Sequence, residues 1–287
     1  MDIKTIAVIG AGTMGRGIAY AAALGGYRTM LEDVRPPMLE QGVAYIRKSL
    51  QEGVARGKVS AEQQQSALAN LSTATTVEVA AREADLVIEA VPEDMRLKIG
   101  LFTELDRVAR PGCILASNTS SLSITEMAAV TARRKQCIGL HFFNPVPKMK
   151  LLEIVRALET DDPTLAACQE VGRRMGKEVV VVRDSPGFIT SRINALIGNE
   201  AFHLLQEGVA SARDIDTALK LGLNHPMGPF ELVDLVGLDV RLSILEYLHR
   251  TLGDKFKPCP LLVQYVKDGR LGKKVGRGVY EYEEGKK

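Results

Sequence analysis

The chain has 287 residues, of which 46% are hydrophobic and 25% charged, as in an ordinary globular protein, and its length suggests two domains. A net charge of +2 without a basic block argues against a nucleic-acid partner. No apolar run reaches the roughly 18 residues of a membrane span, and the first strand starts too early for a targeting peptide. We therefore expect a cytoplasmic protein with no membrane or nucleic-acid partner.

The first predicted element is a buried parallel strand from Ile3 to Ile9, followed by a glycine-rich turn and an alanine-rich helix. The turn reads Gly10-x-Gly12-x-x-Gly15, which is a weak signal alone but becomes a dinucleotide fingerprint between a strand and a helix. Gly12 would let a pyrophosphate approach the backbone, and the helix start would donate N–H groups to it. The predicted cofactor-binding residues here are Gly10, Gly12, Thr13, Met14 and Gly15.

A carboxylate follows near the end of the second predicted strand, at the position that contacts the adenosine ribose in this fingerprint. Asp33, with Glu32 beside it, would accept hydrogen bonds from the ribose hydroxyls and repel a 2′-phosphate, which predicts NAD as the cofactor. Asp33 could instead cap the next helix. Arg35 leaves NADP open, because a guanidinium can bind a 2′-phosphate.

The stretch 36–71 is polar, helical in period and too long for a standard crossover. It predicts a helical pair inserted into a nucleotide-binding fold. From the residues alone, its basic side chains are better explained as a solvated face than as an anion site.

Three apolar runs further on, 84–91, 113–120 and 137–143, each lead into polar residues. Ligands bind at the carboxyl ends of strands in open parallel sheets, so these residues predict a site. The serine-rich segment after the second run could also cap a helix. The polar residues are Glu93, Asn118, Ser120, His141 and Asn144.

His141 and Glu153 are the candidates for proton transfer. Glu153 shares the period-2 face of the next strand with Leu151 and Val155, so its carboxylate should be buried and should need a partner. Asn144-Pro145 would bend the chain between the two strands and bring Glu153 beside His141. We predict that Glu153 orients His141 as a general base. No metal is expected, because neither the histidines nor the four scattered cysteines have ligand spacing.

Helical periods dominate from residue 186 onward, where "SPGFITSRINALIGNEA" predicts a helix that starts at Pro186. The expected architecture is a Rossmann-like α/β nucleotide-binding domain with an inserted helical pair, residues 1–185, followed by an all-helical C-terminal domain, residues 186–287. Helical domains with large apolar faces often pair with a second copy.

Six segments, in order along the chain, resemble the short-chain L-3-hydroxyacyl-CoA dehydrogenases, and within that family most closely the bacterial 3-hydroxybutyryl-CoA enzymes. The resemblance implies reversible hydride transfer between NAD(H) and C3 of a short-chain (S)-3-hydroxyacyl-CoA, with an acyl-CoA substrate and a homodimer built through the helical part. The segments are "VIGAGTMGRGIA", "ASNTSSLSITE", "GLHFFNPVPKMKLLEIV", "SPGFITSRI", "LGLNHPMGPFELVDLVGLD" and "GRLGKKVGRGVYEY".

The same resemblance implies roles for single residues. Asp33 would hold the adenosine ribose, His141 would be the base held by Glu153, and Ser120 would bond the substrate oxygen. Ser49 and Arg56, on the inserted helical pair, would meet the CoA part, although the family usually has lysine at the second position. The residues implied to line the nicotinamide half are Glu93, Lys98, Ser120 and Asn144.

One position departs from the family pattern. The family commonly has asparagine in "PGFxxNR", where this chain has Ser191, which we expect to act as a shorter substitute in the site. Two other functions remain open: a CoA-independent hydroxy-acid or sugar-acid dehydrogenase of the same architecture, and a non-catalytic NAD-binding relative. The sequence leaves the pathway open among fatty-acid breakdown, butyrate or polyester metabolism and aromatic-acid degradation.

Overall fold

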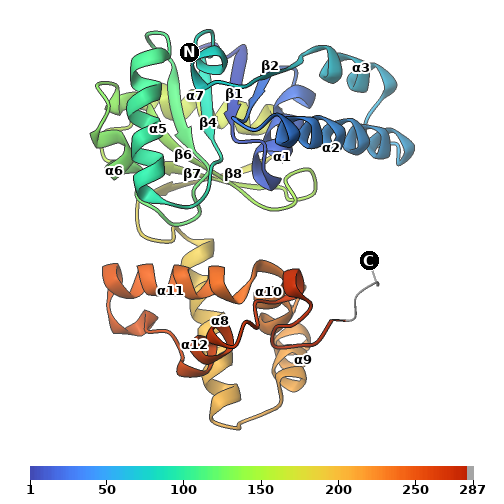
Figure 1. The fold of residues 1–287 in the computed structure, drawn as a ribbon, viewed down its shortest axis with the longest axis vertical. Coiled ribbons are helices and arrows are strands. Elements are labelled where there is room, and N and C mark those ends of the chain that lie inside the picture. Colours follow the sequence, from blue (N-terminus) through green and yellow to red (C-terminus); the bar gives the residue numbers. More distant parts are fainter. Residues whose placement is uncertain (283–287) are drawn as a thin grey trace. The chain divides into compact units, whose positions relative to one another are not determined.

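The computed structural model describes residues 1–282 and divides into two units, Met1–Asp184 and a second that begins at Ser185. An eight-stranded sheet in the order β3-β2-β1-β4-β5-β6-β7-β8 forms the centre of the first unit (Figure 1). All neighbouring strands are parallel except β6 and β7. The strands are β1 Thr5–Ile9, β2 Arg28–Glu32, β3 Leu71–Ala74, β4 Leu86–Glu89, β5 Ile114–Ser117, β6 Cys137–Phe142, β7 Leu151–Arg156 and β8 Glu178–Arg183.

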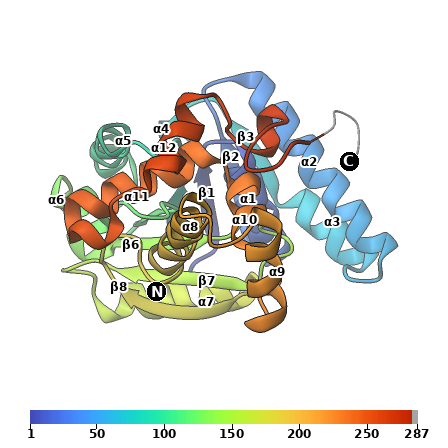
Figure 2. The same cartoon turned by 90° about the horizontal axis from the view of Figure 1, so that it is seen from below.

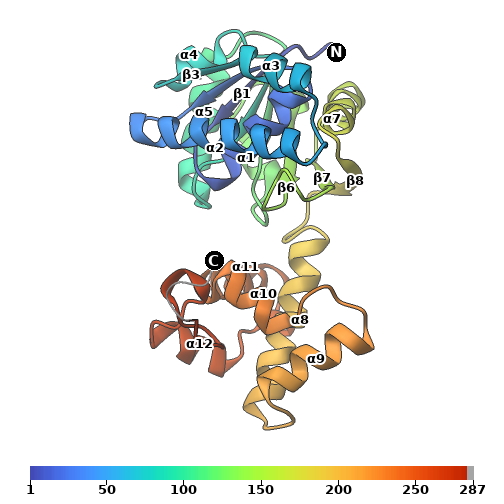
Figure 3. The same ribbon diagram turned by 90° about the vertical axis from the view of Figure 1, so that its right-hand side faces the viewer.

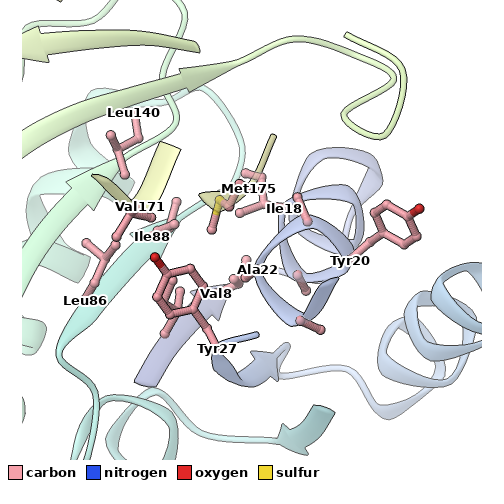
Figure 4. Close-up of a cluster of buried hydrophobic side chains, with 14 of the residues drawn as sticks. Val8, Ile18, Tyr20, Ala22, Tyr27, Leu86, Ile88, Leu140, Val171 and Met175 are labelled. Atoms are coloured by element: carbon pink, nitrogen blue, oxygen red, sulfur yellow. The ribbon is translucent and has the colours of Figure 1, made fainter. Parts of the chain in front are cut away.

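Helices cover both faces of this sheet, so the central strands are buried on both sides and read as continuous apolar runs. One face packs against α1 and α7. Figure 4 shows Ile18 of α1, Val171 of α7 and Met175 directly after α7 around Val8, Ile88 and Leu140 of the strands. The other face packs against α4, α5 and α6. The helices are α1 Thr13–Leu24, α2 Pro36–Ala55, α3 Ala61–Ala69, α4 Val77–Ala81, α5 Met95–Val108, α6 Ile124–Ala129 and α7 Asp162–Arg174.

The inserted helical pair is α2 and α3, which confirms the prediction for this stretch. Pro36 occupies the first position of α2, where its missing N–H is not needed, and Ser60 caps α3 in a reciprocal capping box with Gln63. Leu39, Ile46 and Leu50 form the buried side of α2. The pair packs on α1 (Figure 3).

The turn between β6 and β7 places two predicted residues opposite each other. The strands pair antiparallel, and His141 is the register partner of Glu153. The Lys177 ammonium anchors the turn, because it donates to the carbonyl oxygens of Val146 at 2.5 Å and Met149 at 2.8 Å. The expected return of the two strands side by side is therefore confirmed.

The second unit is helical (Figure 2). Its core contains Phe202, Phe230 and Phe256. The first helix begins at Thr190 and not at Pro186 as predicted, because Gly187 and Phe188 have φ values of 72° and 50°, which an α-helix excludes. The α-helices are α8 Thr190–Gln206, α9 Ala212–Gly222, α10 Pro229–Val236, α11 Leu238–Leu252 and α12 Pro260–Lys267.

Among residues 1–282, no helix combines the length and apolar character needed to cross a bilayer.

Cys113, Cys137, Cys168 and Cys259 are all buried free thiols. Burial raises the pKa of each thiol, so the reactive thiolate is disfavoured and the cysteines act as small core residues.

Candidate functional site

The turn between β1 and α1 has the backbone shape of a phosphate cradle. Gly10 has a φ of 97°, and a Cβ there would also lie 2.9 Å from the Ala90 carbonyl oxygen. A Cβ on Gly15 would overlap the Gly10 carbonyl, so helix and turn pack without a side chain between them. Gly12 is the N-cap of α1, supplies no side-chain cap and borders open space, so the first amides of the helix, at Thr13 and Met14, could receive a phosphate.

Asp33 follows β2 and is joined to this cradle. Its Oδ2 accepts a hydrogen bond from the Ala11 amide at 3.0 Å, and its Oδ1 accepts one from the Arg35 amide at 3.0 Å. The N-cap of α2 is Arg35, so Asp33 is not the helix cap that the sequence left open. The Arg35 guanidinium lies 3.4 Å from Asp33 Oδ1. Arg35, the residue that could bind a 2′-phosphate, is therefore paired with the carboxylate that would repel such a phosphate.

Glu32 lies next to Asp33 in the same corner of the fold. Only 2% of its surface is exposed, and its Oε1 has no hydrogen-bond partner within the described chain. Burial, together with the negative charge of Asp33, raises the pKa of Glu32 to about 7. This carboxyl group can therefore be partly protonated near neutral pH.

Glu93 and Ser120 meet between the ends of β4 and β5. Glu93 Oε1 accepts hydrogen bonds from the Thr119 hydroxyl at 2.5 Å, the Ser120 amide at 3.0 Å and the Ser120 hydroxyl at 3.3 Å. Ser123 separately caps α6, because its hydroxyl oxygen accepts a hydrogen bond from the Glu126 amide. The serine-rich segment thus does both things proposed from sequence: one serine caps a helix and another lies at the strand end.

Lys98 lies behind Glu93 in the protein interior. Only 1% of its side chain is exposed, and its ammonium lies 2.6 Å from Glu89 Oε1 and 3.4 Å from Glu93 Oε2. Glu89 also accepts hydrogen bonds from the Ser117 hydroxyl at 2.5 Å and the Val91 amide at 2.7 Å. Burial raises the pKa of Glu89, while Lys98, Ser117 and Val91 counteract that rise.

Sequence reasoning missed Glu89 and Ser117. A signal for Glu89 was present, because a carboxylate ends the fully apolar run of β4, "LVIE". Like Glu153, a buried carboxylate at this position needs a hydrogen-bond partner.

His141 and Glu153 form a buried pair at the end of β6. His141 Nδ1 lies 2.7 Å from Glu153 Oε2, and the two residues are 6% and 1% exposed. The Phe143 ring lies 4.3 Å from the imidazole, measured between centroids. A carboxylate on Nδ1 selects the tautomer with the proton on that nitrogen and stabilises the imidazolium, so the ring would exchange protons through Nε2.

Adjacent strands bring most of the predicted residues of the first unit together. In the sheet order, β4, β5 and β6 are consecutive, and the side-chain carbonyl of Asn118 accepts a hydrogen bond from the Phe142 amide at 3.0 Å. Asn144 is exposed directly after β6. The His141 imidazole, the Ser120 hydroxyl and the Glu93 carboxylate therefore lie at or just after the carboxyl ends of three neighbouring strands.

The remaining predicted residues lie on other elements. Ser49 is half-buried on α2, and Arg56 is the exposed C-cap of the same helix, 3.6 Å from Glu52. Ser191 is the second residue of α8, in the helical unit. Residues 1–282 contain no group of three or more histidine, cysteine, aspartate or glutamate side chains arranged to hold a metal ion.

Two family models match the chain in succession. The model of the 3-hydroxyacyl-CoA dehydrogenase NAD binding domain matches residues 5–185. The model of the 3-hydroxyacyl-CoA dehydrogenase C-terminal domain matches residues 187–282.

Individual proteins are similar over nearly the whole chain. The 3-hydroxybutyryl-CoA dehydrogenase of Bradyrhizobium diazoefficiens is 47% identical over 98% of this chain and 96% of its own. The mitochondrial hydroxyacyl-coenzyme A dehydrogenase of Homo sapiens is 40% identical over 98% of this chain and 91% of its own. The crystal structure of (S)-3-hydroxybutyryl-CoA dehydrogenase from Ralstonia eutropha matches with a TM-score of 0.94 and 42% identity, covering 99% of this chain and all of the other.

Proposed function

The chain belongs to the 3-hydroxyacyl-CoA dehydrogenase family, and from this premise we propose that it transfers a hydride reversibly between NAD(H) and C3 of a short-chain (S)-3-hydroxyacyl-CoA. The proposed substrate pair is 3-hydroxybutyryl-CoA and acetoacetyl-CoA, by similarity to the relatives named for that substrate. The observation that carries the proposal is the 2.7 Å contact between His141 and Glu153 at the end of β6.

His141 acts as the acid–base group in this proposal. During oxidation, Nε2 accepts the proton of the C3 hydroxyl, and the Glu153 carboxylate stabilises the imidazolium that forms. During reduction, the same nitrogen returns the proton to the C3 oxygen. NAD, when bound, supplies the hydride acceptor. The Ser120 hydroxyl donates to the substrate oxygen in place of its 3.3 Å hydrogen bond to Glu93 Oε1, and so fixes that oxygen near His141.

The residues at the carboxyl ends of the strands would hold the cofactor in this proposal. The amides at the start of α1 would bind the pyrophosphate, and Asp33 would accept hydrogen bonds from the hydroxyls of the adenosine ribose. Glu93 and Asn144 would line the nicotinamide half, with Lys98 behind Glu93.

The substrate's CoA part is proposed to contact α2 through Ser49 and Arg56. The surface position of Arg56 supports a role for this guanidinium with a phosphate, because its 3.6 Å ion pair with exposed Glu52 is of a kind that holds a side chain only weakly. Ser191 at the start of α8 is proposed to contact the substrate in place of the family's asparagine.

We further propose two domain roles: NAD binding for residues 1–185, and substrate binding and dimerisation for residues 186–287. An apolar groove of about 430 Å³ between α8 and α9, lined by Leu196, Leu204, Ile215 and Leu219, supports a homodimer interface in the helical part. Leu223 lines the same groove and is 66% exposed. The enzyme is proposed to work in the cytoplasm.

The test compares two substrates of the purified protein. NADH oxidation is followed by absorbance with acetoacetyl-CoA and, separately, with acetoacetate. We expect turnover with the thioester and at least about a hundredfold lower kcat/KM with the free acid, because binding energy from the CoA part supports the reacting centre. Equal turnover of both would favour a CoA-independent hydroxy-acid dehydrogenase, and no turnover of either would favour a non-catalytic relative.

A further inference from the structure

Glu89 is a buried charged residue to which the proposed mechanism gives no task. It has no exposed surface, and its two carboxylate oxygens accept three hydrogen bonds from β5, α5 and the loop after β4. A carboxylate can be buried at tolerable cost only with such partners, and one of them, the Lys98 ammonium at 2.6 Å, carries the opposite charge. Glu89 and Lys98 are therefore a compensated pair.

Lys98 couples this pair to the surface of the site. Its ammonium is 2.6 Å from Glu89 and 3.4 Å from Glu93, so Glu89 is the closer of two competing carboxylates. With 1% of its side chain exposed, Lys98 presents almost no surface to a bound molecule. Its charge must act mainly through the two carboxylates beside it.

Glu93 is the member of this network that faces outward, with 39% of its side chain exposed. One oxygen faces Lys98, and the other gathers the Thr119 and Ser120 groups described above. Because Glu89 lies closer to the ammonium than Glu93 does, Glu93 can keep its Oε1 on the Ser120 amide, which positions this serine. If the charge on Glu89 were lost, the buried ammonium would attract Glu93 inward, because opposite charges interact strongly away from water.

We infer that Glu89 is a positioning residue, which holds Lys98 so that Glu93 orients the Ser120 hydroxyl at the nicotinamide half of the site. The inference rests on the proposed function, because Ser120 is the hydroxyl that this function uses. Glu89 acts through Lys98 and Glu93 and has no surface with which to contact substrate or cofactor.

Three variants test the inference. Glu89→Gln keeps the shape of the side chain and removes its charge. The double variant Glu89→Gln/Lys98→Met removes both buried charges, so that nothing attracts Glu93 inward. Asp106→Asn is the matched control, because it breaks the 2.8 Å ion pair of Asp106 with Arg133 on the same helix, α5, at the end away from the site.

We expect Glu89→Gln to lower kcat for acetoacetyl-CoA with NADH by about tenfold or more, the scale of losing an oriented hydrogen bond in a site. The double variant should recover at least about threefold over Glu89→Gln and retain about a third of wild-type kcat. Asp106→Asn should lower the thermal midpoint while kcat stays within about twofold of the wild type. A purely structural role predicts instead that kcat follows the folded fraction in all three.

The inference is wrong if Glu89→Gln has wild-type kcat, or if the double variant is no better than Glu89→Gln. If circular dichroism shows that Glu89→Gln does not fold, the double variant decides: about a third of wild-type kcat supports the inference, and a loss of about tenfold or more contradicts it. If neither variant folds, Glu89 is structural and the inference fails. If the wild type does not reduce acetoacetyl-CoA, the proposed function fails separately. NADH dissociation constants from fluorescence then test the inference, with weaker binding expected in Glu89→Gln and recovery in the double variant.

Discussion

His141 Nδ1 and Glu153 Oε2 lie 2.7 Å apart across two antiparallel strands, in a pair that is almost wholly buried. The register of β6 and β7 makes the two residues direct neighbours, so the backbone ladder sets the position of both side chains. In the proposed function this contact orients the imidazole, and protons exchange through Nε2.

Glu153→Gln should lower kcat for acetoacetyl-CoA by roughly 10–10³-fold, with less effect on NADH affinity. The glutamine amide removes the charge that stabilises the imidazolium, and its NH₂ group can select the wrong tautomer of His141. Steady-state kinetics and NADH fluorescence titration give the two numbers. A Glu153→Gln enzyme with wild-type kcat would show that the carboxylate only fills space.

Asp33 predicts a clear preference for NADH over NADPH in kcat/KM. Its carboxylate would repel a 2′-phosphate, and the Arg35 guanidinium already lies against it. Asp33→Ala should narrow the preference by at least about tenfold, because the repulsion is removed and Arg35 is released to meet the phosphate. If NADPH were the better cofactor of the wild type, the assignment of Asp33 would be wrong.

Ser191 tests the departure from the family pattern. The start of α8 at Thr190 puts this serine in the first turn of the helix. Ser191→Ala should reduce kcat/KM for acetoacetyl-CoA by up to about tenfold, the effect of one neutral hydrogen bond, and Ser191→Asn should keep or raise it. Unchanged kcat/KM in Ser191→Ala would mean that the side chain serves only the helix.

Glu32 predicts a pH-dependent stability. Its pKa rises from 4.5 to about 7 in the folded protein, so the folded state binds more protons than the unfolded state between these values. The free energy of unfolding that this group contributes therefore falls as the pH rises from 4.5 to about 7. Above about pH 7 the buried, ionised carboxylate destabilises the folded state to its full extent. Glu32→Gln should stabilise the protein by about 1–2 kcal/mol at about pH 8, after allowance for solvent screening, and hardly at all at about pH 4.

The measurement is the thermal midpoint at both pH values, with exposed Glu83→Gln as the matched control. That control should show no gain at either pH. An equal gain for Glu32→Gln at acidic and alkaline pH would mean that the burial of charge is not the cause.

The sequence was sufficient to predict the parts of the site that depend on local pattern. The glycine spacing predicts the β1–α1 turn, and the alternation around Glu153 predicts a buried carboxylate that needs a partner. Both follow from short-range geometry, in which one residue's neighbours determine its surroundings.

Other features depend on contacts between distant segments. The run "LVIE" shows a buried charge at Glu89 but does not identify Lys98 and Ser117 as its partners, because these lie on different elements. The short edge strand β3, "LSTA", lacks an apolar pattern and was not predicted. The start of α8 was misplaced because the positive φ of Phe188 is unusual for a phenylalanine and has no signal in its neighbours.

The most direct test of His141 as the base is the variant His141→Gln, measured for kcat with acetoacetyl-CoA and, in parallel, for the NADH dissociation constant. We predict that kcat falls roughly 10²–10⁴-fold, the usual contribution of a positioned acid–base group, while NADH binds within about threefold of the wild type. Turnover near the wild-type rate in this variant would contradict the assignment of His141 as the base.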